Sequence, residues 1–245
     1  MRFLRRPVVW VGALFVILTL TMDRLRPLFH WLFPNLDRPV YTRASFLDLA
    51  LSHAVLAGSA SLIAVVLGVG AAVFATRPSG KSFAPTLETL TSIAQTFPPV
   101  AVLALAVPSM GYGAAPTLLA LILYGLLPVT SAALAGLRGI SPATIEAADG
   151  TGFSPLSRLW QIELPMAAPV ILSGVRTSTI IGIGTATIGS TVGALTLGSP
   201  IIDGLSGSNP AFVIQGTVLV ALFAITVDML FGEIARWLPH QESDN

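Results

Sequence analysis

Long apolar segments alternate with short polar segments along the whole chain. Six segments are mostly apolar over lengths close to the roughly 20 residues that a helix needs to cross a bilayer. Proline, glycine or charged residues separate each segment from the next. The pattern predicts an all-α, polytopic transmembrane helical bundle of about six spans, at residues 7–22, 49–75, 89–110, 116–136, 167–193 and 210–232.

The composition agrees with a membrane protein. Of the 245 residues, 53% are hydrophobic and 10% are charged, whereas a soluble domain usually carries about 25% charged residues. The chain has no cysteine, which removes disulfides and thiolate metal sites. The net charge of +1 argues against a nucleic-acid partner. The lipid bilayer is therefore the expected surrounding.

The first apolar segment follows Arg2, Arg5 and Arg6, and a basic start before an apolar stretch is also typical of a signal peptide. Residues 22–24 are bulky or charged and offer no small-residue cleavage site. We therefore expect a retained helix. The chain divides into an N-terminal span and loop (1–45), a main transmembrane domain (46–236) and a tail (237–245).

Basic residues in the loops bear on orientation, because they gather on the cytoplasmic side of membrane proteins. If loop 137–166 is cytoplasmic, the parity of six spans places loop 76–88 and both termini on that side as well. Loop 23–45 then lies outside despite its four arginines, which is the one disagreement with the rule.

The loop at 138–166 carries helix start and stop signals. Ser141 and Ser154 are each followed by proline, and a serine cap with proline in the first helical position is a common way to start a helix. Gly150 and Gly152 lie where the chain must reverse, which suits glycine because it accepts positive φ. The sequence predicts a helix-turn-helix of two short helices on the membrane surface.

The same loop resembles the "EAA" loop of binding-protein-dependent ABC importer permeases, and every specified position is matched. In that family the loop inserts a coupling helix into a groove of a cytoplasmic ATPase. The resemblance implies that three small residues allow close backbone approach and that Glu146 makes a polar contact. The alternative is a loop that merely joins two spans. The matched positions are Glu146, Ala147, Ala148, Gly152, Ile162, Leu164 and Pro165.

The resemblance also implies a type I ABC importer permease fold in the bacterial inner membrane. Its partners would be a cytoplasmic ABC ATPase dimer, a periplasmic solute-binding protein, and a sister permease or a second copy of this chain. The sequence has no Gly-Lys-Ser/Thr phosphate loop, so ATP is expected on the partner. We expect no cofactor, no metal site and no enzymatic activity of its own; an intramembrane enzyme would need a paired catalytic set.

Residues 50–235 look like the quaternary-amine branch of these permeases, which imports glycine betaine, choline, carnitine and related osmoprotectants. Two departures are residues 130–132, where the branch usually has Arg-Asn, and 195–196, where it usually has Gly-Gly. The alternative is the same permease with an amino acid, an oxyanion or a metal chelate as cargo. The segments that carry the likeness are 95–98, 111–113, 123–129, 176–177, 183–188, 193–194, 197–198, 201 and 204–205.

Arg176 and Asp228 lie inside predicted spans, and an isolated charge at the bilayer centre costs about 2.5–3.5 kcal/mol. Both lie about two helical turns from the same side, so we expect them to pair, either as a gate or as a static link between two helices.

Five further side chains are candidates for function or for packing. Phe97, Tyr112 and Tyr124 either line the transport path or pack between helices and at the interface. Asp48 and His53, near one end of a span, are expected to be solvated by headgroups and water. His53 has no companion at a spacing suited to a metal ion.

Overall fold

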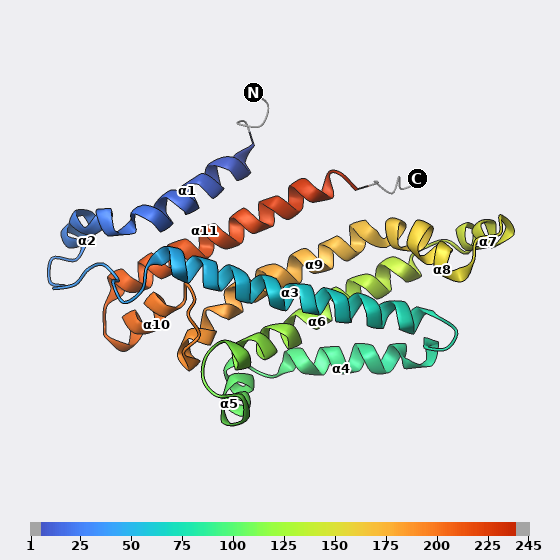
Figure 1. The fold of residues 1–245 in the computed structure, drawn as a ribbon, viewed down its shortest axis with the longest axis horizontal. Coiled ribbons are helices and arrows are strands. Elements are labelled where there is room, and N and C mark those ends of the chain that lie inside the picture. Colours follow the sequence, from blue (N-terminus) through green and yellow to red (C-terminus); the bar gives the residue numbers. More distant parts are fainter. Residues whose placement is uncertain (1–5, 239–245) are drawn as a thin grey trace.

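A computed structural model gives the structure of the protein and describes residues 6–238; Arg2, Arg5 and most of the predicted tail lie outside this range. The described chain consists of helices joined by short connections (Figure 1). They are α1 (Pro7–Thr21), η2 (Met22–Leu25), α2 (Arg26–Leu32), α3 (Phe46–Thr76), η3 (Lys81–Phe83), α4 (Ala84–Thr96), α5 (Pro99–Met110), α6 (Ala114–Arg138), α7 (Pro142–Gly150), α8 (Pro155–Arg158), η4 (Leu159–Glu163), α9 (Leu164–Ala186), η5 (Ile188–Val192), α10 (Ser199–Ser206) and α11 (Pro210–Ala235).

Within residues 6–238, five helical stretches are long and apolar enough to cross a membrane. The predicted all-α transmembrane bundle is therefore confirmed. Five of the six predicted segments overlap these stretches, which are Pro7–Leu32, Phe46–Thr76, Ala114–Arg138, Pro155–Ala186 and Pro210–Ala235.

The predicted span at 89–110 is wrong as a single helix, because the chain breaks between α4 and α5. Phe97 has ψ 131° and Pro98 has ψ 137°, both extended. A proline pushes the residue before it out of the helical region and supplies no N–H for a helical hydrogen bond. Since Pro99 follows Pro98, the helix cannot continue through either residue. Helix α4 lies along α6, and α5 runs in a different direction from α4 (Figure 1).

The fifth predicted span also differs from expectation. Helices α8 and α9 are joined by η4, a π-helical turn, so that one helical stretch runs from Pro155 to Ala186. The second helix of the predicted helix-turn-helix is therefore the beginning of a span. At its other end, α9 stops at Ala186. The 3₁₀ turn η5 follows, and Gly193 after it has φ 83°.

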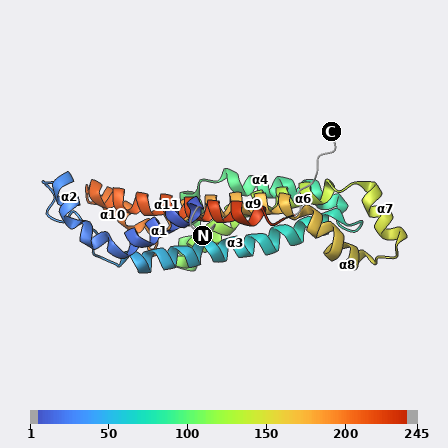
Figure 2. The ribbon, with the colours of Figure 1, turned by 90° about the horizontal axis from the view of Figure 1, so that it is seen from above.

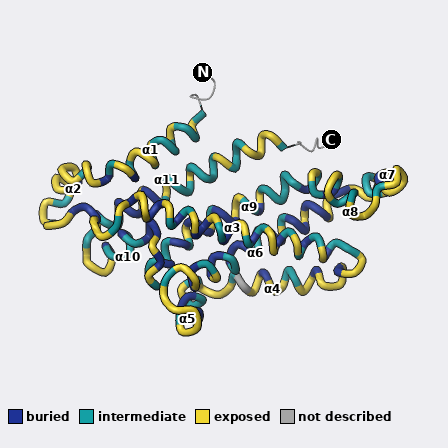
Figure 3. Tube along the Cα trace, in the orientation of Figure 1, coloured by how far each residue is buried: buried dark blue, intermediate teal, exposed yellow. Residues whose placement is uncertain are grey.

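Helices α3, α6 and α9 pack along one another in the centre of the bundle, where most buried residues lie (Figure 3). A Cβ added at Gly174 of α9 would lie 2.5 Å from the carbonyl oxygen of Pro128 of α6. Small residues allow membrane helices to approach this closely. At the edge of the bundle, α1 packs on α11 through the stacked rings of Phe15 and Phe223, 5.4 Å apart.

His53 is fully buried, so the expectation that lipid headgroups solvate it is wrong. Its Nδ1 accepts a hydrogen bond from the backbone N–H of Leu197 at 3.2 Å, and its Nε2 lies 3.0 Å from the carbonyl oxygen of Ile183. Since Nδ1 accepts, Nε2 carries the proton and donates it to Ile183. His53 therefore ties α3 to α9 and to the segment after η5. Asp48 is exposed in the first turn of α3, where a negative charge is favourable.

The two ends of the bundle carry different connections. Helix α7 lies at one end together with the turn after α3, and α2 and α10 lie at the other end (Figures 1 and 2). This agrees with the expected relative placement of the loops, in which 76–88 and 137–166 share a side and 23–45 lies opposite.

Candidate functional site

Helix α7 is defined by capping at both ends. Ser141 Oγ accepts a hydrogen bond from the N–H of Thr144 at 3.2 Å, and proline follows it, as predicted. At the other end Gly152 has φ 87°. Its N–H donates to the Asp149 carbonyl at 3.0 Å, and the N–H of the next residue donates to the Ala148 carbonyl at 3.2 Å. These two bonds form a Schellman motif, whose left-handed position favours glycine.

The return from α7 leads directly into the membrane helix. Ser154 Oγ accepts a hydrogen bond from the N–H of Ser157 at 3.2 Å and starts α8. The π turn follows, in which the N–H of Leu164 bonds to the carbonyl of Leu159, five residues earlier. π turns inside helices are rare and occur often at functional sites. The turn separates α7 and α8 from the regular helix α9.

The matched loop residues lie on two sides of this unit. Ala147, Ala148 and Ile162 help to line a hollow of about 530 Å³ on the loop surface. Ala148 is buried, while Glu146 and Ala147 are exposed on α7. The other four matched positions, Glu146 among them, do not line the hollow: Leu164 packs against the apolar cluster of α3, α4, α6 and α9, and Gly152 and Pro165 are exposed.

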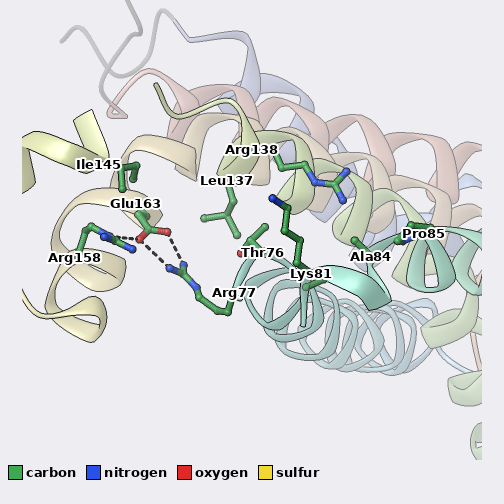
Figure 4. A pocket seen from close by; sticks show the side chains of 11 residues that line it. Thr76, Arg77, Lys81, Ala84, Pro85, Leu137, Arg138, Ile145, Arg158 and Glu163 are labelled. Carbon is green, nitrogen blue, oxygen red and sulfur yellow. Dashed lines mark hydrogen bonds and ion pairs between the residues drawn. The ribbon is translucent and has the colours of Figure 1, made fainter. Parts of the chain in front are cut away.

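A network of charged side chains joins the loop to the end of α3 (Figure 4), and the sequence analysis did not predict it. Glu163, in the π turn, accepts two hydrogen bonds from Arg77, which follows the last residue of α3, at 3.0 and 2.5 Å. It also accepts one from Nε of Arg158 at 2.9 Å, and Nη1 of Arg158 pairs with Asp149 of α7. The Glu163 side chain is 6% exposed. Arg77, Arg158 and Glu163 border a cavity of about 520 Å³ next to Lys81.

No local signal could have revealed this chain of charges. Residues five apart, such as Arg158 and Glu163, face different sides of an α-helix, because neighbours on one face are three or four apart. The π turn, whose hydrogen bonds join residues five apart, brings them together. Arg77 lies 86 residues from Glu163. The contact therefore depends on a local helix defect and on a distant segment.

Arg176 of α9 and Asp228 of α11 lie side by side, as their positions suggested. Nε of Arg176 donates to one carboxylate oxygen and Nη2 to the other, each at 2.6 Å. Their side chains are 44% and 40% exposed on the single chain. They lie on the outside of the bundle, next to a hollow of about 310 Å³ between α9 and α11. Two-bond pairs of this kind are the strongest arginine–carboxylate contacts.

The three aromatic candidates do not converge. Tyr124 is buried within α6, while Phe97 at the α4–α5 break and Tyr112 before α6 are exposed. Gln95 Nε2 donates a hydrogen bond to the Tyr124 carbonyl at 2.7 Å, which joins α4 to α6. Burial of the Tyr124 side chain favours the packing interpretation for this residue. Within residues 6–238, no three histidine or acidic side chains gather in a way that could hold a metal ion.

Long apolar helices with a capped helical loop at the bundle end define a polytopic membrane protein. The family model described as "Binding-protein-dependent transport system inner membrane component" matches residues 64–238, and the chain belongs to this family. The family resemblance inferred from the loop is thus confirmed.

Two relatives cover most of the chain. It is 37% identical over 199 residues to the osmoprotectant import permease protein OsmY of Salmonella typhimurium, which covers 81% of this chain and 84% of the relative. It is 40% identical over 184 residues to the choline transport system permease protein OpuBB of Bacillus subtilis, covering 73% and 83%.

Solved structures share the fold. An inward-facing conformation of the MetNI methionine ABC transporter superposes with a TM-score of 0.71 at 18% identity, over 79% of this chain and 96% of that chain. An amino acid ABC transporter superposes with a TM-score of 0.65 at 18% identity, over 90% and 98%. At this identity the likeness concerns the fold alone.

Proposed function

We propose that this chain is the transmembrane permease subunit of an ATP-driven importer for osmoprotectants, namely glycine betaine or related quaternary amines. One structural observation carries the permease role: α7, with its matched loop residues, stands exposed at the end of the bundle and connects at both ends to spanning helices. The relatives' names support the solute class. The alternative is the same role with another small solute.

The proposed mechanism is mechanical. A cytoplasmic ATPase dimer would hold α7, with the exposed Glu146 and Ala147 against its groove and Gly152 keeping the turn tight. Helix α6 ends at Arg138, and α7 begins at Pro142, after its cap Ser141. On the other side of the loop, α8 continues into α9. Closing the ATPase dimer would therefore move α6 and α9 as rigid bodies and switch access across the membrane.

The other partners follow from this role. A periplasmic solute-binding protein would select the solute, with an aromatic cage for a quaternary ammonium on that protein. A sister permease or a second copy of this chain would complete the path. ATP would be bound by the ATPase subunits, and this chain would need no cofactor. An ATPase contact at α7 would put that helix on the cytoplasmic side of the inner membrane, and the parity of the spans would put both termini there as well.

The test is uptake of radiolabelled glycine betaine in cells that carry the complete system, with choline, carnitine and proline as competitors. Gly152→Asp should abolish uptake while the protein accumulates normally in the membrane. Gly150→Ala is the matched control, because a Cβ at Gly150 meets nothing within 4 Å and its φ is not positive. Normal uptake in Gly152→Asp would contradict the coupling role. An assembled wild-type system without betaine uptake would favour the alternative cargo.

A further inference from the structure

Four charged side chains form an unbroken path from α7 to the end of α3. Asp149 pairs with Arg158, Arg158 with Glu163, and Glu163 with Arg77. The four residues belong to α7, α8, the π turn and the C-terminal cap of α3. Figure 4 shows the carboxylate of Glu163 between the guanidinium groups of Arg158 and Arg77. The path crosses from the candidate coupling helix to a span that is far away in sequence.

Stability alone does not explain a buried carboxylate at this position. Burial of a charge is costly, and buried ion pairs can often be replaced by apolar residues with no loss of stability. The neighbouring positions are apolar, since Ala75, Leu137 and Leu164 pack together at this end of the bundle. Apolar residues at positions 77, 158 and 163 together would extend that cluster. The charged arrangement therefore calls for a role beyond holding the fold.

The connectivity of the helices suggests what that role is. Helices α6 and α9 join the loop through the backbone, so they follow any movement of α7. Helix α3, a span of 31 residues, has no direct backbone connection to the loop. In the described part of the chain, its hydrogen bonds to the loop are those that Arg77 donates to Glu163. This contact gives α3 its polar connection to the loop.

The apolar side of the α3 end is packed, since Ala72 and Ala75 lie in the cluster with α6, and the other side of this end faces a cavity. Thr76 and Arg77 border the cavity of about 520 Å³, together with Lys81 and the start of α4. Nε of Arg77 is buried without a hydrogen-bond partner, and such groups are uncommon and need an explanation. Side-chain packing does not fix this terminus from the cavity side. On this side, the polar contact that holds the α3 end is therefore the one with Glu163.

We propose that Glu163 is a positioning residue that makes α3 follow the ATPase-driven movement of α7, so that three spans move together. The inference rests on the proposed function, since it requires an ATPase that acts on α7. Without Glu163, α6 and α9 would still move with the loop, while the end of α3 would lag behind. ATP would then be hydrolysed with little solute carried.

The test uses the complete transporter, with its ATPase and solute-binding protein, reconstituted in proteoliposomes. Glycine betaine imported per ATP hydrolysed is compared between wild type and Glu163→Gln, whose amide nitrogen cannot accept a hydrogen bond from the second arginine. We expect a fall of about tenfold, within the range of known coupling effects, with the subunits still assembled. Glu88→Gln is the control, because Glu88 pairs with Arg138 at the end of α6, beside the same cavity, and is not part of the path from Asp149 to Arg77.

A second variant tests whether the connection itself is what matters. The chain has no native cysteine, so Arg77→Cys combined with Glu163→Cys gives two unique thiols. We expect this double variant to be uncoupled, and a short bifunctional maleimide joining the two thiols to restore at least part of the betaine-to-ATP ratio. A role in folding alone would give no such rescue.

The outcomes separate this inference from the proposed function. A wild-type assembly that imports no betaine or other osmoprotectant with ATP would overturn both. An active wild type whose ratio is unchanged in Glu163→Gln, or whose cross-linked double variant stays uncoupled, would overturn the role of Glu163 alone. Failure of both variants to assemble would also overturn it, because the charges would then serve folding.

Discussion

Arg176 and Asp228, 52 residues apart in sequence, meet through two hydrogen bonds of 2.6 Å that join α9 to α11. Both side chains are more than a third exposed on the isolated chain, so they face lipid or another subunit within the membrane. In either setting each charge depends on the other, because an unpaired charge at the bilayer centre costs about 2.5–3.5 kcal/mol.

We predict that Asp228→Ala lowers the amount of protein assembled in the membrane, because it leaves Arg176 without its partner. The exchanged pair, Arg176→Asp with Asp228→Arg, should restore assembly. Membrane fractions measured by immunoblot would test this. Betaine uptake by the exchanged pair then separates the two roles: normal uptake indicates a static link, and assembled protein without uptake indicates a gate. Normal assembly of Asp228→Ala would contradict the prediction.

A second prediction concerns the turn after α7. Gly152→Ala forces an alanine to φ 87°, and a left-handed conformation costs an L-residue about 1–2 kcal/mol. We expect reduced uptake and weaker capture of the ATPase by the purified permease. Gly152→Asn should be milder, because asparagine tolerates this conformation better. Gly150→Ala should retain both activities; equal loss in the Gly150 and Gly152 variants would contradict the prediction.

A third prediction concerns the close contact of α6 and α9. A Cβ at Gly174 would lie 2.3 Å from Cβ of Ala132 and 2.5 Å from the Pro128 carbonyl. Gly174→Ala must push the helices apart, and overpacking of this kind costs about 1–3 kcal/mol. Gly182→Ala, on the same helix, meets nothing within 4 Å. Thermal unfolding in detergent should show a lower midpoint for Gly174→Ala only.

A fourth prediction concerns pH and the segment before α3. The Tyr41 hydroxyl lies in hydrogen-bonding distance, 3.1 Å, of Oδ2 of Asp203 on α10. Burial, followed by the nearby charge of Asp203, raises the pKa of Tyr41 from 10.0 to about 12. A raised pKa means that the folded protein holds this proton more tightly than the unfolded chain. The resulting stability is complete below pH 10 and is lost as the pH rises from 10 to 12.

Tyr41→Phe removes this titration. Thermal midpoints of wild type and Tyr41→Phe, measured from pH 8 to 11, should differ by a constant amount below about pH 10, the ordinary pKa of tyrosine. The wild type should lose its advantage above that pH. Parallel midpoints over the whole range would show that Tyr41 does not titrate between the folded and unfolded states in this way.

The sequence was most informative where the signals were local. The ends of α7 depend on Ser141 and Gly152, which bond to residues within three or four positions of themselves. Such bonds follow from residue type and spacing, so both caps could be predicted. The break at Pro98 is equally local, but the apolar character of 89–110 predicts a single span, which the two prolines interrupt.

The tertiary structure alone decided which distant residues meet. His53 bonds to Ile183 and Leu197, and Glu163 bonds to Arg77, across 130, 144 and 86 positions. The sequence by itself determined that the chain is an apolar helical bundle with a capped loop, because helix formation and capping depend on near neighbours. Packing of α3 against α6 and α9 decided the rest, since a buried polar group takes whichever partner the folded helices place within hydrogen-bonding distance.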